Sequence, residues 1–236
     1  MDDITRALVV TAHPDDVDFG AAGTVATLVA QGVEVSYCII TDGDAGGFDP
    51  TVPRSEIPRI RHAEQRAAAA LVGVTDVRFL AYRDGELTVS HDLRRDISRV
   101  IRQVRPQRVI TQSPERNWDR IQASHPDHLA AGEATMQAVY PDARNPFAHI
   151  SLLADEGLEE WTVAEIWLMA TPAPTTYVDI TDVLELKLQA IGAHVSQLPD
   201  RAQMEERVRA WTSGNATAAG LGPGRFAEAF RVVSTA

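Results

Sequence analysis

The chain has 236 residues, of which 44% are hydrophobic and 23% are charged, which is the composition of a globular protein with a well-filled core. Its formal net charge of −11 at pH 7 would repel a phosphate backbone, so the composition argues against a nucleic-acid-binding protein. The single cysteine, Cys38, excludes a disulfide framework or a cysteine-based zinc knuckle within one chain.

Neither a targeting signal nor a membrane segment is predicted. The chain begins with Met1-Asp2-Asp3, which is acidic where a secretory signal is basic, and the apolar run that follows is short. No stretch stays apolar over the length that a bilayer requires. We therefore expect a cytoplasmic protein that does not enter a membrane.

Short apolar runs alternate with helical patterns through the first two thirds of the chain. This alternation predicts an α/β fold with a Rossmann-like, mostly parallel sheet and helices on both faces. Strands are predicted at residues 7–12, 33–41, 77–81 and 108–111. Helices are predicted at residues 21–31, 58–71, 91–104 and 126–139, with loops at 42–57 and 112–124.

The last third of the chain has a weaker pattern. Strands are predicted at residues 163–170 and 177–180, and helices at 183–197 and 201–212. Residues 213–225 are rich in glycine and alanine, and we expect them to form a mobile segment. No linker or internal repeat divides the chain, so we predict a single domain over residues 1–236.

Three polar loops are predicted at one edge of this sheet. His13 follows the first strand, Thr41-Asp42-Gly43 follows the second, and His125 follows the fourth. Ligands of parallel α/β sheets bind at the carboxyl ends of the strands. The sequence therefore predicts that these loops together form a functional site.

The first of these loops contains the tetrapeptide His13-Pro14-Asp15-Asp16. His13 and Asp16 can turn toward one point, and Pro14 stiffens the turn between them. Asp15 is then free to take a proton from an attacking water. The alternative is that an aspartate caps the next helix and that His13 is an ordinary polar loop residue.

A second tetrapeptide, His125-Pro126-Asp127-His128, opens the fourth predicted helix. Pro126 suits the first position of a helix, which places His128 in the first turn, directed back toward the sheet edge. His125 would then stabilise a developing oxyanion or protonate a leaving nitrogen. The nearest carboxylate that could partner His125 is that of Asp127. The alternative is that Ser124 and Asp127 are capping groups and that both histidines lie on the surface.

Together the two clusters supply the ligands of a catalytic zinc site with an open coordination position. Such a site uses two imidazoles and one carboxylate, which here would be His13, His128 and Asp16. The same ligand set also accepts Fe(II) or Co(II), and metal availability decides among these ions.

The order and spacing of these motifs resemble those of the PIG-L/LmbE-type zinc-dependent N-deacetylases. Val17 departs from the pattern, because some members carry glutamate after the aspartate pair, and this bears on the subfamily but leaves the ligand set intact. The matching segments keep the family's order along nearly the whole chain, and they are Ala12 to Asp16 with Gly20, Thr41 to Gly46, Arg61 to Glu64, His125 to His128, and Lys187 to Gln197.

The resemblance implies a Rossmann-like fold and the hydrolysis of an acetamide on a small amino sugar of the N-acetylglucosamine type. It is also compatible with a homo-oligomer. The implied roles are zinc binding by His13, Asp16 and His128, general-base catalysis by Asp15, oxyanion stabilisation by His125, orientation of that histidine by Asp127, and substrate contact by Arg61.

Three further residues are candidate substrate contacts. Trp118 and Asp119 lie in the loop before the second cluster, and an aromatic face packs well on a sugar ring. A loop tryptophan can equally be a packing residue. His194 lies on an apolar predicted helix, where it is either a buried, hydrogen-bonded histidine or part of the pocket.

Two other functions stay open from the sequence alone. One keeps the metal site but cleaves a larger conjugate, such as a sugar–thiol adduct, as an amidase. The other is a non-catalytic sugar-binding protein, although binding alone has no need of Asp15 as a base. A dehydrogenase is excluded because no G-x-G-x-x-G follows the first strand.

Overall fold

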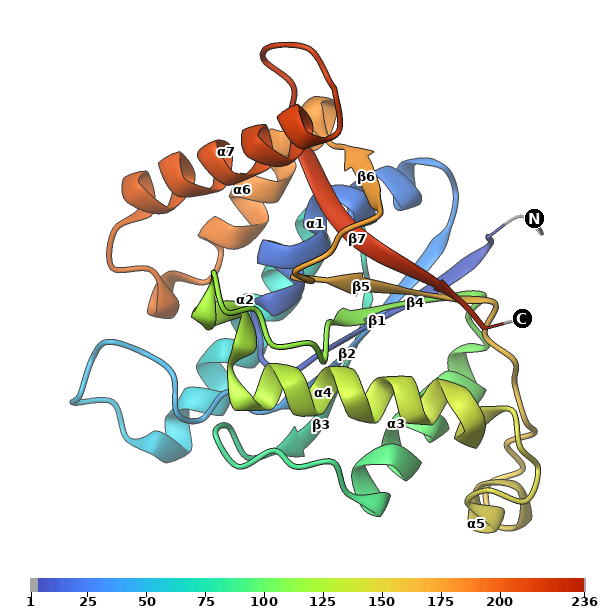
Figure 1. The fold of residues 1–236 in the computed structure, drawn as a ribbon. Coiled ribbons are helices and arrows are strands. Elements are labelled where there is room, and N and C mark those ends of the chain that lie inside the picture. The colour runs from blue at the N-terminus through green and yellow to red at the C-terminus, as the bar shows by residue number, and fades with distance from the viewer. Residues whose placement is uncertain (1–3, 236) are drawn as a thin grey trace.

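Seven strands form one sheet, in the order β3-β2-β1-β4-β5-β7-β6, in the computed structural model, which describes residues 4–235 (Figure 1). Strands β1 to β5 run parallel to one another, and β7 runs antiparallel to both β5 and β6. The mostly parallel α/β sheet predicted from the sequence is therefore confirmed. The strands are β1 (Arg6–Thr11), β2 (Glu34–Thr41), β3 (Asp76–Tyr82), β4 (Arg108–Gln112), β5 (Glu165–Met169), β6 (Thr176–Asp179) and β7 (Ala227–Ser234).

Helices cover both faces of the sheet (Figure 1). The helices α1, α2 and α6 lie over one face, α3 and α4 cover the other, and α7 packs on the outside of α6. The helices are α1 (Asp16–Ala30), α2 (Ile57–Leu71), α3 (His91–Val104), α4 (Pro126–Gln137), α5 (Ile150–Ala154), α6 (Leu184–Gly192) and α7 (Arg201–Ala218). Shorter helical turns lie at Arg54–Glu56, Ile121–Ser124, Ala138–Ala143, Thr181–Val183 and Val195–Gln197. Among residues 4–235, no helix combines the length and the apolar composition that crossing a bilayer would require.

Successive residues of the central strands face opposite layers. In β1, Val9 packs in the layer of α1 and α2, whereas Leu8 and Val10 pack in the layer of α3 and α4. All three side chains are fully buried. A strand that is buried on both faces is apolar at consecutive positions, which is why uninterrupted apolar runs marked these strands in the sequence.

The later elements differ from the sequence-based expectation. α6 ends at Gly192 instead of continuing to residue 197, because the chain turns there and carries His194 into the interior. α7 continues to Ala218 instead of ending at residue 212, because its buried face extends to Ala216. The mobility of residues 213–225 stays a prediction. β7 was not predicted, since polar residues interrupt its apolar positions.

The buried carboxylate of Glu228 fixes β7 to α1 and α6. Its Oε1 atom accepts hydrogen bonds from the Gly23 amide (3.0 Å) and from Lys187 Nζ (2.7 Å). Its Oε2 atom accepts from the amide and the hydroxyl of Thr24, at 2.7 and 2.6 Å. Because four donors surround it, this carboxylate is tolerated inside the core and sets the position of β7.

α4 approaches β4 closely at Gly132. A Cβ atom at this position would stand 2.3 Å from the carbonyl oxygen of Gln112, a separation that real side chains do not reach. The absence of a side chain therefore lets α4 lie directly on β4. This contact brings the first turn of α4 to the carboxyl ends of β1 and β4.

We expect Gly132→Ala to destabilise the fold by about 1–3 kcal/mol, because the added methyl group must push α4 away from β4. The urea midpoint of unfolding measures this effect. Gly214→Ala is the control, since Gly214 is also helical but has no atom within 4 Å of the added methyl group. This control should be neutral or up to about 1 kcal/mol more stable. Equal midpoints for Gly132→Ala and the parent protein would refute the close contact.

Candidate metal centre

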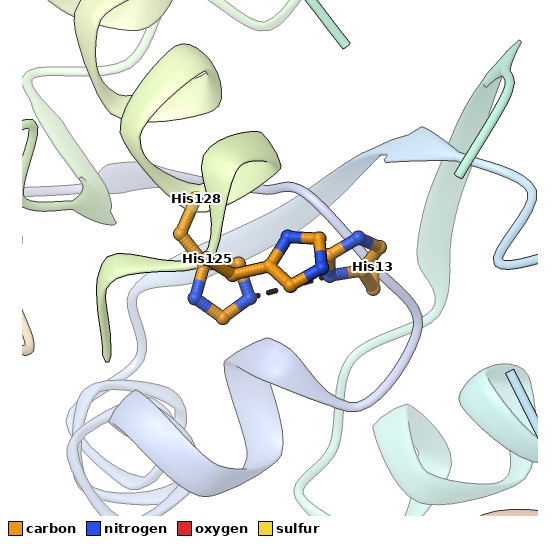
Figure 2. A group of neighbouring side chains, drawn as sticks. All are labelled: His13, His125 and His128. Atoms are coloured by element: carbon orange, nitrogen blue, oxygen red, sulfur yellow. Dashed lines mark hydrogen bonds between the residues drawn. The ribbon is translucent and has the colours of Figure 1, made fainter. Parts of the chain in front are cut away.

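Three side chains converge at the carboxyl ends of β1 and β4. His13 lies in the loop after β1, Asp16 begins α1, and His128 projects from the first turn of α4 toward His13 (Figure 2). His13 Nδ1 lies 3.3 Å from His128 Nε2 and 3.2 Å from Asp16 Oδ2. His128 Nε2 lies 3.0 Å from Asp16 Oδ1. The structure thus brings together the three residues that the sequence proposed as metal ligands.

The donor atoms of this trio fit a divalent ion. Ligand atoms bound to one tetrahedral zinc at about 2.0–2.1 Å stand about 3.3 Å apart, which is close to the separations found here. Two nitrogens and one carboxylate also match a zinc site that keeps an open position. The Asp16 carboxylate is further held by Gln112 Nε2 (2.8 Å) and by the amide of His13 (2.7 Å).

Asp15 lies beside this trio but is directed to other partners. Its backbone is in the left-handed region, with φ 104°, which is a strained conformation for a residue with a side chain. The amide of Asp15 donates to Gln65 Oε1 (2.8 Å), and its carboxylate accepts from Arg61 Nη2 (3.1 Å). Burial raises the pKa of Asp15 to about 6, although Arg61 opposes this rise. Strained backbone of this kind is concentrated at functional sites.

The second nitrogen of His13 contacts two carboxylates. His13 Nε2 lies 3.1 Å from Asp127 Oδ2 and 3.2 Å from Asp84 Oδ1. Asp127 also accepts hydrogen bonds from the amides of Gly85 (2.7 Å) and Leu87 (3.2 Å). A carboxylate that contacts one ring nitrogen of a histidine fixes the orientation of the ring. Asp127 and Asp84 therefore direct the other nitrogen of His13, Nδ1, toward Asp16 and His128.

This arrangement differs from the prediction that Asp127 orients His125. The Asp127 carboxylate contacts His13, because its first-turn position in α4 directs it toward the loops after β1 and β3. The hydrogen bond from Asp127 to His125 comes from the backbone amide, which donates to Nδ1 at 3.1 Å. Asp84 was missed in the sequence, although it comes three residues after the predicted strand at 77–81, whose carboxyl end meets the same edge.

The carboxylates around the two histidines stabilise positive charge. Burial lowers the pKa of His13, but Asp16, Asp127 and Asp84 outweigh burial and raise it to about 12. Burial likewise lowers the pKa of His128, and Asp16 more than compensates, so this pKa is raised. The centre therefore favours a cation, and a divalent ion would satisfy the same carboxylates.

His125 stands in a different electrostatic environment. Its ring lies 4.9 Å from that of His13 and 5.2 Å from that of His128, measured between centroids. Burial lowers the pKa of His125, and the two neighbouring histidines lower it further. These effects outweigh the opposing charges of Asp127 and Asp84 and favour the neutral imidazole. Because Nδ1 accepts the Asp127 amide, the proton of the neutral ring is assigned to Nε2, which can donate a hydrogen bond.

Arg61 is enclosed by the loops that carry the site. Only 3% of it is exposed, and its guanidinium donates to the carbonyl of Gly43 (3.0 Å), to the carbonyl of Pro14 and to Asp15. It therefore links the loops after β1 and β2 and holds Asp15. Contact of Arg61 with a substrate stays a prediction.

His194 lies behind Asp15, away from the surface. It is fully buried, and its Nε2 atom lies 2.8 Å from Asp18 Oδ2. The same oxygen accepts from Gln65 Nε2 (2.9 Å), and Gln65 in turn holds the amide of Asp15. The structure therefore favours the buried, hydrogen-bonded reading of His194 over a direct substrate contact, because no part of the ring is accessible.

The two remaining candidates, Trp118 and Asp119, lie on the exposed loop before α4. The side chain of Trp118 is 80% exposed and stacks against Arg116, whose guanidinium carbon lies 5.5 Å from the ring centroid. The amide of Asp119 donates to Asn117 Oδ1 (3.1 Å). The loop borders the site, and the contact of these two residues with a substrate stays a prediction.

The chain matches known proteins over most of its length. Residues 8–139 match the family described as "PIG-L: GlcNAc-PI de-N-acetylase". Diacetylchitobiose deacetylase of Thermococcus kodakarensis is 33% identical over 198 residues, which cover 84% of this chain and 72% of that protein. Probable N-acetyl-alpha-D-glucosaminyl L-malate deacetylase 2 of Bacillus cereus is 35% identical over 199 residues, with coverages of 81% and 83%.

The fold is also similar to that of a solved structure. N,N′-diacetylchitobiose deacetylase from Pyrococcus horikoshii, complexed with its inhibitor MPG, superposes with a TM-score of 0.90. The two sequences are 34% identical, and the match covers 98% of this chain and 85% of that chain. The similarity therefore extends over the sheet, both helical layers and the loops that carry the candidate centre.

We expect metal-free protein to bind one zinc ion, and His128→Ala to weaken this binding by at least about 100-fold. Loss of an outer partner alone costs about 10–100-fold in affinity, so loss of a direct ligand should cost no less. Calorimetric titration in a zinc-buffered solution measures the affinity. His91→Ala, at an exposed position that begins α3, is the matched control. An unchanged affinity of His128→Ala would contradict the ligand set.

Asp127→Asn tests which histidine Asp127 supports. Because its carboxylate contacts His13, we expect the zinc affinity to fall by about 10–100-fold. Asp119→Asn removes the same charge from an exposed loop position and should leave the affinity unchanged. If Asp127 served only His125, Asp127→Asn would bind zinc as tightly as the parent protein.

Proposed function

Because this chain belongs to the PIG-L family, we propose that it is a metal-dependent hydrolase that removes the acetyl group from an N-acetylglucosamine-type amino sugar. The membership agrees with the resemblance predicted from the two histidine clusters. The observation that carries the proposal is the convergence of His13, Asp16 and His128 beside a carboxylate, Asp15, that is not part of the trio. Binding of a sugar alone would not need that carboxylate.

The metal is proposed to be held by His13, Asp16 and His128. When bound, a divalent ion would polarise the acetamide carbonyl and lower the pKa of a water molecule. Zinc suits the two nitrogens and the carboxylate, and Fe(II) or Co(II) would bind the same set.

Asp15 is proposed to act as the general base. Its carboxylate would take a proton from the water that attacks the carbonyl carbon and pass it to the leaving nitrogen. The C–N bond then breaks, and the products are acetate and the free amino sugar. Arg61 and Gln65 hold Asp15 in place through its carboxylate and its amide, so its position would not depend on the substrate.

His125 is proposed to stabilise the oxygen of the tetrahedral intermediate. Its Nε2–H is free to donate because Nδ1 is occupied by the amide of Asp127. A donor directed at a developing negative charge contributes about 3–4 kcal/mol in comparable hydrolases. The relatives named above support the substrate class, since one is a diacetylchitobiose deacetylase and the other a probable N-acetyl-alpha-D-glucosaminyl L-malate deacetylase.

Asp15→Asn should keep the bound metal and lower acetate release by about 10²–10⁴-fold, which is the usual contribution of a general base. Asparagine tolerates the left-handed backbone of this position, so the variant should fold normally. Acetate release from N-acetylglucosamine and N,N′-diacetylchitobiose, together with metal analysis, gives both quantities. Asp92→Asn, exposed on α3, controls for the loss of one charge.

Two outcomes would count against the proposal. Full activity of Asp15→Asn would remove Asp15 from the reaction while leaving the deacetylase activity intact. Absence of acetate from every N-acetylated amino sugar, tested with metal-loaded parent protein, would overturn the deacetylase activity itself.

A further inference from the structure

A larger cavity lies next to the metal centre. A small cavity of about 180 Å³ is lined by Asp16 and His128, and it reaches outward to Phe19 and Arg120. The same Phe19 and Arg120 also line a second cavity of about 490 Å³, which extends to α7. Because the two cavities share these two residues, the larger one adjoins the cavity at the metal centre.

Two arginines line this larger cavity without an acidic partner. Within residues 4–235, neither Arg120 nor Arg207 has a carboxylate within 4.0 Å of its guanidinium nitrogens, whereas Arg209 of the same helix pairs with Glu185 at 2.7 Å. Both side chains are exposed at the rim of the cavity, where desolvation and then the charge of Arg207 lower the pKa of Arg120, so two like charges lie at one cavity wall. An anion between them would remove this repulsion.

The remaining walls of the cavity do not compensate these charges. Among the described residues that line it, only Asp200 is acidic, and its carboxylate caps α7 by accepting the amide of Gln203 at 3.0 Å. Arg120 stacks on Trp211, with its guanidinium carbon 4.3 Å from the ring centroid. This contact fixes the guanidinium plane at the cavity wall, in an otherwise acidic protein of net charge −11.

We propose that the larger cavity binds an anionic group on the aglycone of the amino sugar, held between Arg120 and Arg207. The inference rests on the proposed function, because it takes the acetamide to be bound at the metal centre. The acetamide of such a sugar is on C2, next to the carbon that carries the aglycone, so the aglycone would lie close to the metal centre, which the larger cavity adjoins. A carboxylate or a phosphate provides the oxygen atoms that two guanidinium groups bind.

The test compares three substrates that differ only in the aglycone. They are methyl N-acetylglucosaminide, an N-acetylglucosaminide of a hydroxy acid, and N-acetylglucosamine 1-phosphate. We expect kcat/KM of the parent protein to be at least about tenfold higher for an anionic substrate than for the neutral one, the effect of one charge-assisted hydrogen bond. The anionic substrate with the higher kcat/KM identifies whether the site prefers a carboxylate or a phosphate. Raising the salt concentration should reduce the preference.

Two variants test whether Arg207 causes the preference for anionic substrates. In Arg207→Gln the ratio of kcat/KM between anionic and neutral substrates should fall toward one. Arg209→Gln should keep the ratio of the parent protein, since Arg209 lies on the same helix but is paired with Glu185. Equal kcat/KM for all three substrates with the parent protein, or a ratio unchanged in Arg207→Gln, would overturn the anion site and leave the deacetylase activity standing.

A binding measurement separates this inference from the proposed function. Calorimetry with Asp15→Asn gives the affinity for each substrate without turnover. Tighter binding of an anionic substrate, lost in Asp15→Asn/Arg207→Gln, supports the site even if no acetate is released by the parent protein. Equal binding of the three substrates would overturn it.

Discussion

The pairing of β1 with β4 in the centre of the sheet is the constraint on which the site depends. Ala7 to Val10 pair in parallel with Arg108 to Thr111, so two strands distant in sequence end side by side. The strand order reverses between them, and a crevice forms at this point in open parallel sheets. His13 and His128, separated by 115 residues, therefore meet at 3.3 Å without long loops reaching across the molecule.

A layer of buried hydrogen bonds then fixes the side chains that the crevice brings together. Asp127 and Asp84 hold the far nitrogen of His13, Gln112 holds Asp16, and Arg61 holds Asp15. Each of these partners lies on a different element from the residue it holds, since Asp127 is on α4, Asp84 follows β3, Gln112 ends β4 and Arg61 is on α2. The geometry of the centre is therefore set by the fold before any ligand arrives, which reduces the ordering cost of binding.

Local patterns in the sequence were sufficient to predict the first four strands and the proximity of the proposed ligands His13, Asp16 and His128. Central strands buried on both faces leave continuous apolar runs, and the ligands lie in two short tetrapeptides next to such runs. Contacts between residues that only long-range packing brings together could not be predicted from local patterns. Asp84 lies in an ordinary-looking turn, and its contact with His13 exists only because β3 ends at the same edge.

The same limit applies to His194. Its burial depends on the end of α6 at Gly192 and on the contact with Asp18, 176 residues earlier in the chain. Likewise, Asp127 is two residues from His125 in sequence, yet its carboxylate serves a histidine of another loop, because the first turn of α4 faces β1.

β7 is the last strand in the chain, yet in the sheet it lies between β5 and β6. During synthesis, β1 and β4, which precede the proposed ligand residues, are complete before β5 emerges, whereas β7 follows only after α7. Until then β5 exposes an unpaired edge with Ile166 and Leu168 beside it, the kind of edge to which other chains add. The pairing of β7 closes that edge late, and Glu228 then anchors β7 on Lys187, so a nascent chain interrupted after α7 keeps a strand edge open to aggregation even though β1 and β4 are already complete.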